Sequence, residues 1–95
     1  MEYRLDLEMT LSRDEFLRLL PGAVGPLTET GEAGVFEGRD GPQRWRIRLA
    51  PLPDLRVGRV VLPRHQVEIR LDGYAEGEVE AFLARFHRGF QRGGG

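Results

Sequence analysis

The chain has 95 residues, with 14 basic and 15 acidic side chains, a formal net charge of −1 and a hydrophobic fraction of 40%. This length is enough for one hydrophobic core and too short for two, and the composition is not that of a disordered tail. All 14 basic residues are arginine and cysteine is absent, which excludes Walker A loops, lysine Schiff bases, thiolate nucleophiles and cysteine-based metal sites.

The residue usage also predicts the setting of the protein. Lysine and asparagine are absent and Ser12 is the single serine, a pattern that GC-rich bacterial codon usage produces and that suits a thermophile. No apolar run approaches the ~20 residues that cross a bilayer, and the alternating residues 1–8 are unlike a signal peptide. Together with the absence of cysteine, this predicts a cytoplasmic protein.

The N-terminal part predicts a strand followed by a short helix. Apolar residues recur at every second position of residues 3–11, which is typical of a half-buried strand. Ser12 followed by Glu15 has the spacing of a helix capping box. Because proline interrupts the hydrogen bonding of a helix, we expect this helix to end at Pro21 and Gly22.

The middle of the chain predicts a hairpin. Residues 35–37 are its clearest first strand, residues 40–41 are typical of a tight turn, and alternation over residues 43–50 indicates the second strand. Proline cannot donate to a central ladder. We therefore expect Pro51 and Pro53 to end this strand and to begin a connection that runs to residue 56.

Two further strands and a helix complete the chain. Residues 57–62 and 66–71 predict strands separated by a break at Pro63. The final helix is indicated by an apolar stripe at helical spacing, formed by Val79, Phe82, Leu83, Phe86 and Phe90. Glutamates at its start and arginines at its end complement the helix dipole.

The predicted order is therefore β-α-β-β-β-β-α, an α+β two-layer sandwich. Short connections favour a mostly antiparallel sheet, with both helices packed on one face and charged residues on the other. We expect a single domain over residues 1–92 and a flexible glycine tail over residues 93–95.

Arginines provide the candidate contact site. Arg44, Arg46 and Arg48 alternate on one strand, and Arg70 is expected on the same face, where guanidinium groups would bind an anion or a protein partner. Acidic residues predicted on that face favour neutralisation across strands instead. A sequence pI near 6.1 does not favour nucleic acid.

The sequence predicts no catalytic, cofactor or metal residue, so we expect a protein that is not an enzyme and needs no cofactor. Ser12 is explained as a helix cap, and His65 and His87 are expected to be solvated. The one group that an enzyme hypothesis names is His65 with Asp72 and Glu76.

The leading hypothesis is a non-enzymatic interaction or assembly module that binds a protein partner or a second copy of itself. It rests on open sheet edges and on apolar residues that one core would leave uncovered, namely Leu52, Leu55 and Phe90. The alternatives are a small-molecule or lipid site between the sheet and the final helix, and anion or nucleic-acid binding through the arginine face. Trp45 and the aromatic residues of the final helix are expected to fill the core, which limits room for a ligand.

Overall fold

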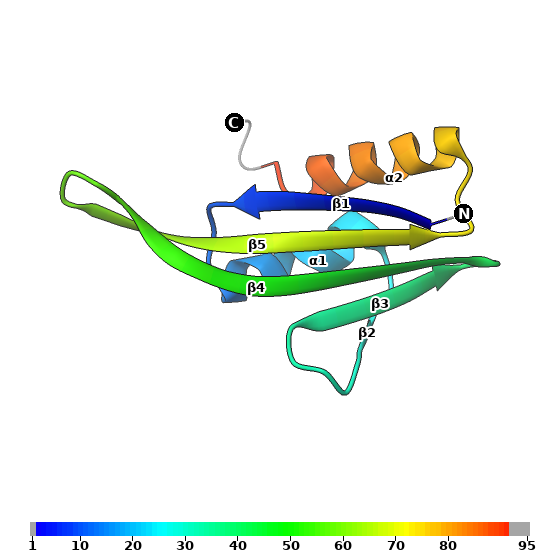
Figure 1. Cartoon of the computed structure of the whole chain (residues 1–95), viewed down its shortest axis with the longest axis horizontal. Coiled ribbons are helices and arrows are strands. Elements are labelled where there is room, and N and C mark those ends of the chain that lie inside the picture. The colour runs from blue at the N-terminus through cyan, green and yellow to red at the C-terminus, as the bar shows by residue number, and fades with distance from the viewer. Residues whose placement is uncertain (1, 92–95) are drawn as a thin grey trace.

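The computed structural model describes residues 2–91, which form one five-stranded antiparallel sheet and two helices (Figure 1). The elements in chain order are β1 (Glu2–Met9), α1 (Arg13–Val24), β2 (Thr28–Glu29), β3 (Val35–Asp40), β4 (Gln43–Val57), β5 (Val60–Asp72) and α2 (Glu76–Gly89). The strand order in the sheet is β1-β5-β4-β3-β2. The predicted α+β class and element order are confirmed, and the predicted tail at residues 93–95 lies outside the described residues.

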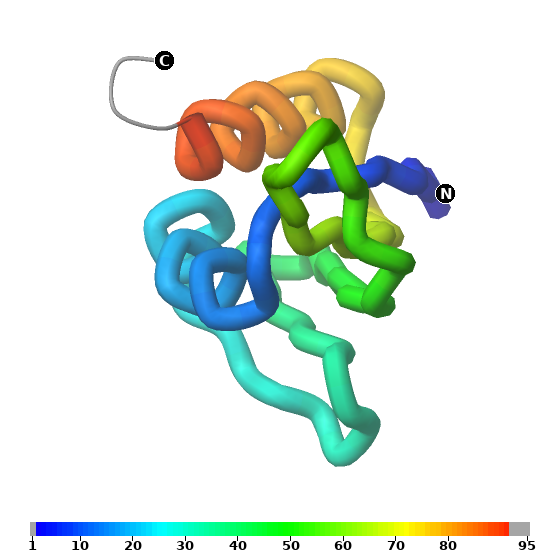
Figure 2. The backbone as a smooth tube through the Cα atoms, turned by 90° about the vertical axis from the view of Figure 1, so that its left-hand side faces the viewer, coloured from blue at the N-terminus to red at the C-terminus, as the bar shows by residue number. Residues whose placement is uncertain are grey.

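Both helices lie against the same face of the sheet, so the molecule has two layers (Figure 2). The core between the layers joins β3, β4 and β5 to both helices, and its largest fully buried side chains include Phe16, Phe36 and Phe86. Arg4, Arg46 and other charged residues alternate with the core residues and face away from the helices. Within residues 2–91, no helix has the length and apolar character that crossing a bilayer requires.

Helix α1 begins where the sequence predicts and ends later. The Ser12 side chain accepts a hydrogen bond from the Glu15 amide at 3.2 Å, which confirms the predicted cap. The predicted end at Pro21 is wrong, because the helix continues to Val24. Its last turn buries Ala23 and Val24, and this packing offsets the one helical hydrogen bond that Pro21 cannot make.

Helix α2 has the predicted apolar stripe. Val79, Phe82 and Phe86 are buried against the sheet and α1, and the Glu78 side chain accepts a hydrogen bond from the Ala75 amide at 2.9 Å at the start of the helix. Phe90 was named both as a residue that one core would leave uncovered and, with the other aromatic residues of this helix, as part of the core; the first prediction is wrong. The Phe90 ring stacks on Phe16, with 5.0 Å between centroids, and therefore extends the core.

The prediction for residues 51–66 is also wrong. Strand β4 does not end at Pro51 but continues to Val57, and β5 runs without a break through Pro63. The two long strands pair as one hairpin that extends beyond the ends of β1 and β3 (Figure 1). The radius of gyration, 13.9 Å, exceeds the value of about 12 Å expected for a compact chain of this length, in agreement with this projection.

Candidate functional site

The projecting part of the hairpin, residues 51–64, was predicted as a connection and not as paired strands, and we call it the arm. Two of its residues were predicted to be uncovered: Leu55 is exposed, as predicted, and Leu52 is half-buried. The last pair between β1 and β5 joins Met9 to His65, and the last pair between β3 and β4 joins Val35 to Arg48. The Leu49 amide also donates a hydrogen bond to the Gly34 carbonyl oxygen at 2.7 Å, and from residue 51 outward β4 and β5 pair only with each other among residues 2–91. The arm is therefore a two-stranded ribbon with two free edges.

The prolines of the arm explain how this ribbon is tolerated. Pro51, Pro53 and Pro63 all lie in its strands. Proline fits a strand where its missing N–H would point to an edge, and both edges of the arm are free. The same residues interrupt the row of donors to which another strand would add, so a partner is expected to bind a face of the arm and not an edge.

A bulge decides which side chains share a face. The register passes from Leu52 opposite Arg64 to Leu55 opposite Leu62, so β4 contains one more residue than β5 in this stretch. This extra residue turns the odd-numbered positions of β4 from the helix-facing side to the opposite side. One face, which we call the aliphatic face, therefore carries Leu52, Leu55, Val57, Val60 and Leu62.

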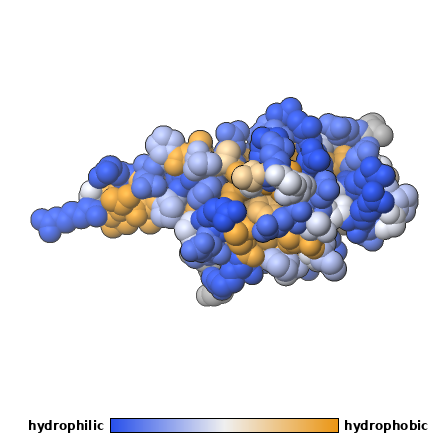
Figure 3. Space-filling model, turned by 90° about the horizontal axis from the view of Figure 1, so that it is seen from below, coloured by the Kyte–Doolittle hydropathy of each residue, from blue (hydrophilic) through white to orange (hydrophobic). Residues whose placement is uncertain are grey.

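The aliphatic face is open to solvent at its outer end. The large hydrophobic side chains that are exposed within residues 2–91 are Leu55, Val57, Val60 and Val61, with exposed fractions of 37%, 58%, 53% and 47%. All four belong to the arm; Leu55, Val57 and Val60 lie on the aliphatic face, and Val61 lies on the other face. Figure 3 shows this apolar surface next to the hydrophilic tip of the molecule. Scattered exposed apolar residues are ordinary, whereas these are confined to one projection, which makes the arm the candidate functional site.

Arg64 connects the arm to the body of the protein. Its Nε donates a hydrogen bond to the carbonyl oxygen of Pro53 at 2.9 Å, inside the bulge, and its guanidinium forms an ion pair with Glu8 of β1. The bulge is thus held in place by a side chain of the neighbouring strand. The three arginines and one aspartate of the arm give it a formal charge of +2, whereas the rest of the chain carries −3.

The predicted arginine site lies on the sheet face opposite the helices. Arg4, Arg70 and Arg46 form a row across β1, β5 and β4, and Arg44 and Arg48 lie in the rows on either side. The structure therefore brings together the four arginines predicted as a contact site, and Arg44, Arg46 and Arg48 are exposed.

Carboxylates accompany three of these four arginines. Arg46 pairs with Glu37 at 3.3 Å, Arg48 pairs with Glu32 at 3.0 Å, and Arg70 pairs with Glu68 at 3.0 Å. Glu68 also accepts a hydrogen bond from Arg4 at 2.7 Å. Within residues 2–91 Arg44 has no carboxylate at ion-pair distance. The face is largely neutralised by its own acids, and binding of an anion there remains a prediction.

The residues named for an enzyme hypothesis are not brought together. His65 lies at the base of the arm, whereas Asp72 ends the same strand seven residues later, which is about 23 Å at the usual rise per residue. His65 was expected to be solvated, and this is wrong: it is half-buried, and its Nδ1 lies 2.9 Å from the Leu11 carbonyl oxygen. Over residues 2–91, no group of three or more acidic or histidine side chains is placed to hold a metal ion.

The space between the sheet and α2 is filled by side chains. Trp45 and Phe82 lie with ring centroids 6.4 Å apart in the core, and Tyr74 packs edge-on against Phe82. Burial, and secondarily the charge of Asp40, raise the pKa of Tyr74 above its ordinary value. The depression beside this cluster, about 290 Å³, is open, and its lining includes Gln43, which donates a hydrogen bond to Glu78.

No protein-family model, curated protein or solved structure matches this chain. One signal for the arm was present in the sequence: valines flank residues 58–59, and glycine at the first position of a two-residue turn favours a tight hairpin. In the structure Gly58 has a φ of 61°, a conformation that glycine adopts at little cost.

Proposed function

We propose that this chain is a non-enzymatic protein-interaction module that docks through the aliphatic face of the arm. The observation that supports the proposal is the confinement of exposed large hydrophobic side chains, within residues 2–91, to this one projection. Burying each valine or leucine side chain in a partner would contribute about 1.5–3 kcal/mol when complete.

The shape of the arm supports the same proposal. An isolated two-stranded hairpin is marginally stable in water, because only one strand pair holds it and both faces are wet. A partner packed on the aliphatic face would order the arm and remove its apolar side chains from water. Proline-interrupted edges leave the two faces of the arm for docking, and the aliphatic face carries three of the four exposed large hydrophobic side chains described within residues 2–91.

Site-specific photo-crosslinking in cells that produce the protein tests the proposal. A photoreactive amino acid replaces Val60, which lies on the aliphatic face, or Val61, which has similar exposure and lies on the other face. We expect discrete adducts from position 60 and not from position 61. Identical adducts from both positions, or none from either, would contradict docking through the aliphatic face.

Anion binding by the arginine face is the second candidate function. It is favoured by the row of Arg4, Arg70 and Arg46 and by the absence of an ion-pair partner for Arg44 within residues 2–91. Binding of inorganic phosphate or a short oligonucleotide should weaken as salt rises and should be lost on substitution of Arg44 and Arg46. No binding at 20 mM salt would remove this candidate.

The setting of the module is proposed from composition. The lack of cysteine in all 95 residues suits the reducing cytoplasm, and the lack of asparagine suits a thermophile. Neither inference depends on the arm.

A further inference from the structure

Two arginines lie opposite each other near the turn between β3 and β4. Arg39 is the cross-strand partner of Arg44, and both are exposed on the sheet face opposite the helices. Within residues 2–91 neither has a carboxylate at ion-pair distance, although Asp72 lies opposite Arg44 on β5. Like charges directly opposite on paired strands repel each other. The pair therefore leaves two guanidinium groups that the described residues do not neutralise by ion pairing.

A backbone donor accompanies these side chains. The Thr30 amide donates a hydrogen bond to the Val35 carbonyl oxygen at 3.1 Å, so the backbone polar groups of Val35 point to the outer edge of β3. This direction alternates along a strand, so the N–H of Arg39 points to the same edge. The pairing of β2 with β3 ends at Thr28 opposite Glu37, before Arg39 is reached. The Arg39 amide is therefore a third donor next to the two guanidinium groups.

An open depression of about 470 Å³ lies beside the arginine pair, within the range of roughly 300–1,000 Å³ that is usual for small-molecule sites. Its lining includes both arginines together with the apolar side chains of Leu27 and Trp45. The Trp45 indole extends over β3 because Gly38 has no Cβ atom, which would lie 2.4 Å from the ring. The depression thus joins a cationic side to an apolar side.

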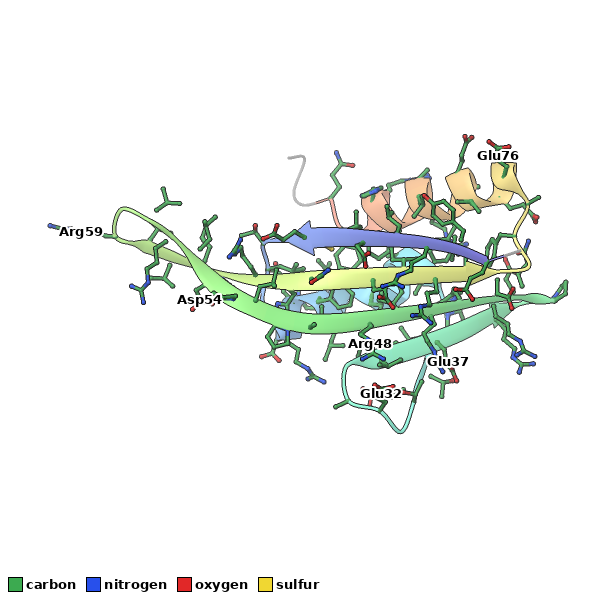
Figure 4. The ribbon with its side chains drawn as sticks, in the orientation of Figure 1. Glu32, Glu37, Arg48, Asp54, Arg59 and Glu76 are labelled. Carbon is green, nitrogen blue, oxygen red and sulfur yellow. The ribbon has the colours of Figure 1, made fainter. Side chains whose placement is uncertain are left out.

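The carboxylate in this lining is already paired. Glu37 forms an ion pair with Arg46 at 3.3 Å. Further along the same two strands Arg48 forms an ion pair with Glu32 at 3.0 Å, and both residues are labelled in Figure 4. At the end of β3 next to the turn, unlike its beginning, positive charge is therefore left for a ligand.

We propose that this depression, which we call the arginine-pair site, binds the phosphate group of a phosphomonoester whose organic part lies against Leu27 and Trp45. Such a phosphate carries a charge of about −1.5 to −2 at pH 7 and has three acceptor oxygens, which match two guanidinium groups and the Arg39 amide. The inference goes beyond docking through the arm. It also places an anion at one end of the arginine face and not along the row that crosses β1, β5 and β4.

Titration of the full chain with phenyl phosphate tests the proposal. Trp45 is the single tryptophan of the chain, so its fluorescence reports on the site directly, and the amide resonance of Arg39 provides a second readout. In about 20 mM salt we expect a saturable change in both signals, with a dissociation constant of about 1 mM that rises with salt. Inorganic phosphate, which has no organic part, should bind at least about threefold more weakly. Equal affinities would overturn a site for an ester.

Three variants locate the binding. R39M and R44M each remove one guanidinium group of the arginine-pair site and should each raise the dissociation constant by about fivefold or more. R48M is the matched control, because it removes the same charge from β4 at a position outside the depression. It should change the dissociation constant by less than about twofold. The absence of a saturable change in the wild type, or equal weakening by R39M and R48M with each variant folded by circular dichroism, would overturn the proposal.

The outcome is separate from that of the proposed function. The arginine-pair site and the arm share no residue, so crosslinking from Val60 tests docking whether or not phenyl phosphate binds. Binding that survives R39M but is lost in R4M would overturn the arginine-pair site. It would leave anion binding along the row of Arg4, Arg70 and Arg46.

Discussion

Gly89 of α2 lies against Ala23 of α1 so closely that a Cβ atom at Gly89 would be 2.4 Å from the Cβ atom of Ala23. The Cα atom of Ala23 would be 2.5 Å away, so a flexible side chain cannot relieve the contact by moving. The two helices therefore approach each other at a pair of small residues. This contact fixes the distance between the helices that cover the sheet.

The first prediction concerns this contact. G89A forces the helices apart or distorts the end of α2, and we expect it to lower the free energy of unfolding by about 1–3 kcal/mol. G77A is the matched control, because Gly77 lies in the first turn of the same helix with nothing within 4 Å of an added Cβ. It should raise stability by about 0.5 kcal/mol. Urea denaturation measures the free energy of unfolding of both variants. Equal changes in G89A and G77A would show that helix propensity, and not the contact with Ala23, determines the effect.

The pH dependence of stability provides the second prediction. Burial is the main cause that raises the pKa of Tyr74 above 10.0, so the folded protein keeps the phenolic proton at a pH where the unfolded chain releases it. The stabilisation is complete below pH 10 and is lost as the pH rises through the folded pKa. Y74F removes this contribution.

Urea midpoints between pH 8 and 11.5 should therefore fall more steeply for the wild type than for Y74F. Y3F retains Tyr74 and should keep the steep fall. If the urea midpoints of the wild type and Y74F fell in parallel with pH, groups other than Tyr74 would cause the loss of stability at alkaline pH.

The third prediction concerns Glu68, whose side chain is 17% exposed and lies between Arg4 and Arg70. E68Q leaves a row of three arginines with fewer carboxylates, and like charges on neighbouring strands repel. We expect a loss of about 1 kcal/mol at low ionic strength and a smaller loss in about 1 M salt, where screening is strong.

E37Q is the control for this prediction, because Glu37 is 48% exposed and has one arginine partner at 3.3 Å. Its effect on the unfolding free energy should be smaller than that of E68Q at every salt concentration. A larger loss in E37Q would mean that the contribution of these ion pairs to stability does not follow the burial of their carboxylates.

Local patterns in the sequence predict much of this fold for a physical reason. Alternation over β1, β4 and β5 records which side chains face the helices, and the stripe of α2 records its buried side. Whether each side chain is buried depends on its position in the strand or helix. These features therefore appear as a pattern among residues that are close in the sequence. The arginines of the candidate contact site were placed on one face by the same reasoning.

The arm was missed because it depends on residues that are distant in the sequence. Pro51 and Pro63 would break a central strand, and they are tolerated here because β3 and β1 end before reaching them. Pro21 was misread for a similar reason, since the turn after it is held by tertiary burial of Ala23 and Val24. The local sequence of a strand does not show where the strands beside it end.

The last prediction tests how the arm is held. R64M keeps most of the apolar side-chain stem but removes the hydrogen bond to the Pro53 carbonyl oxygen and the ion pair with Glu8. The Arg64 side chain then no longer links the bulge to β1. We expect faster amide hydrogen exchange in residues 52–62 and a fall of about 1 kcal/mol in the unfolding free energy. R56M is the control, because Arg56 lies in the same arm without an ion-pair partner among residues 2–91. Exchange that is as fast in R56M as in R64M would show that loss of charge, and not release of the bulge, loosens the arm.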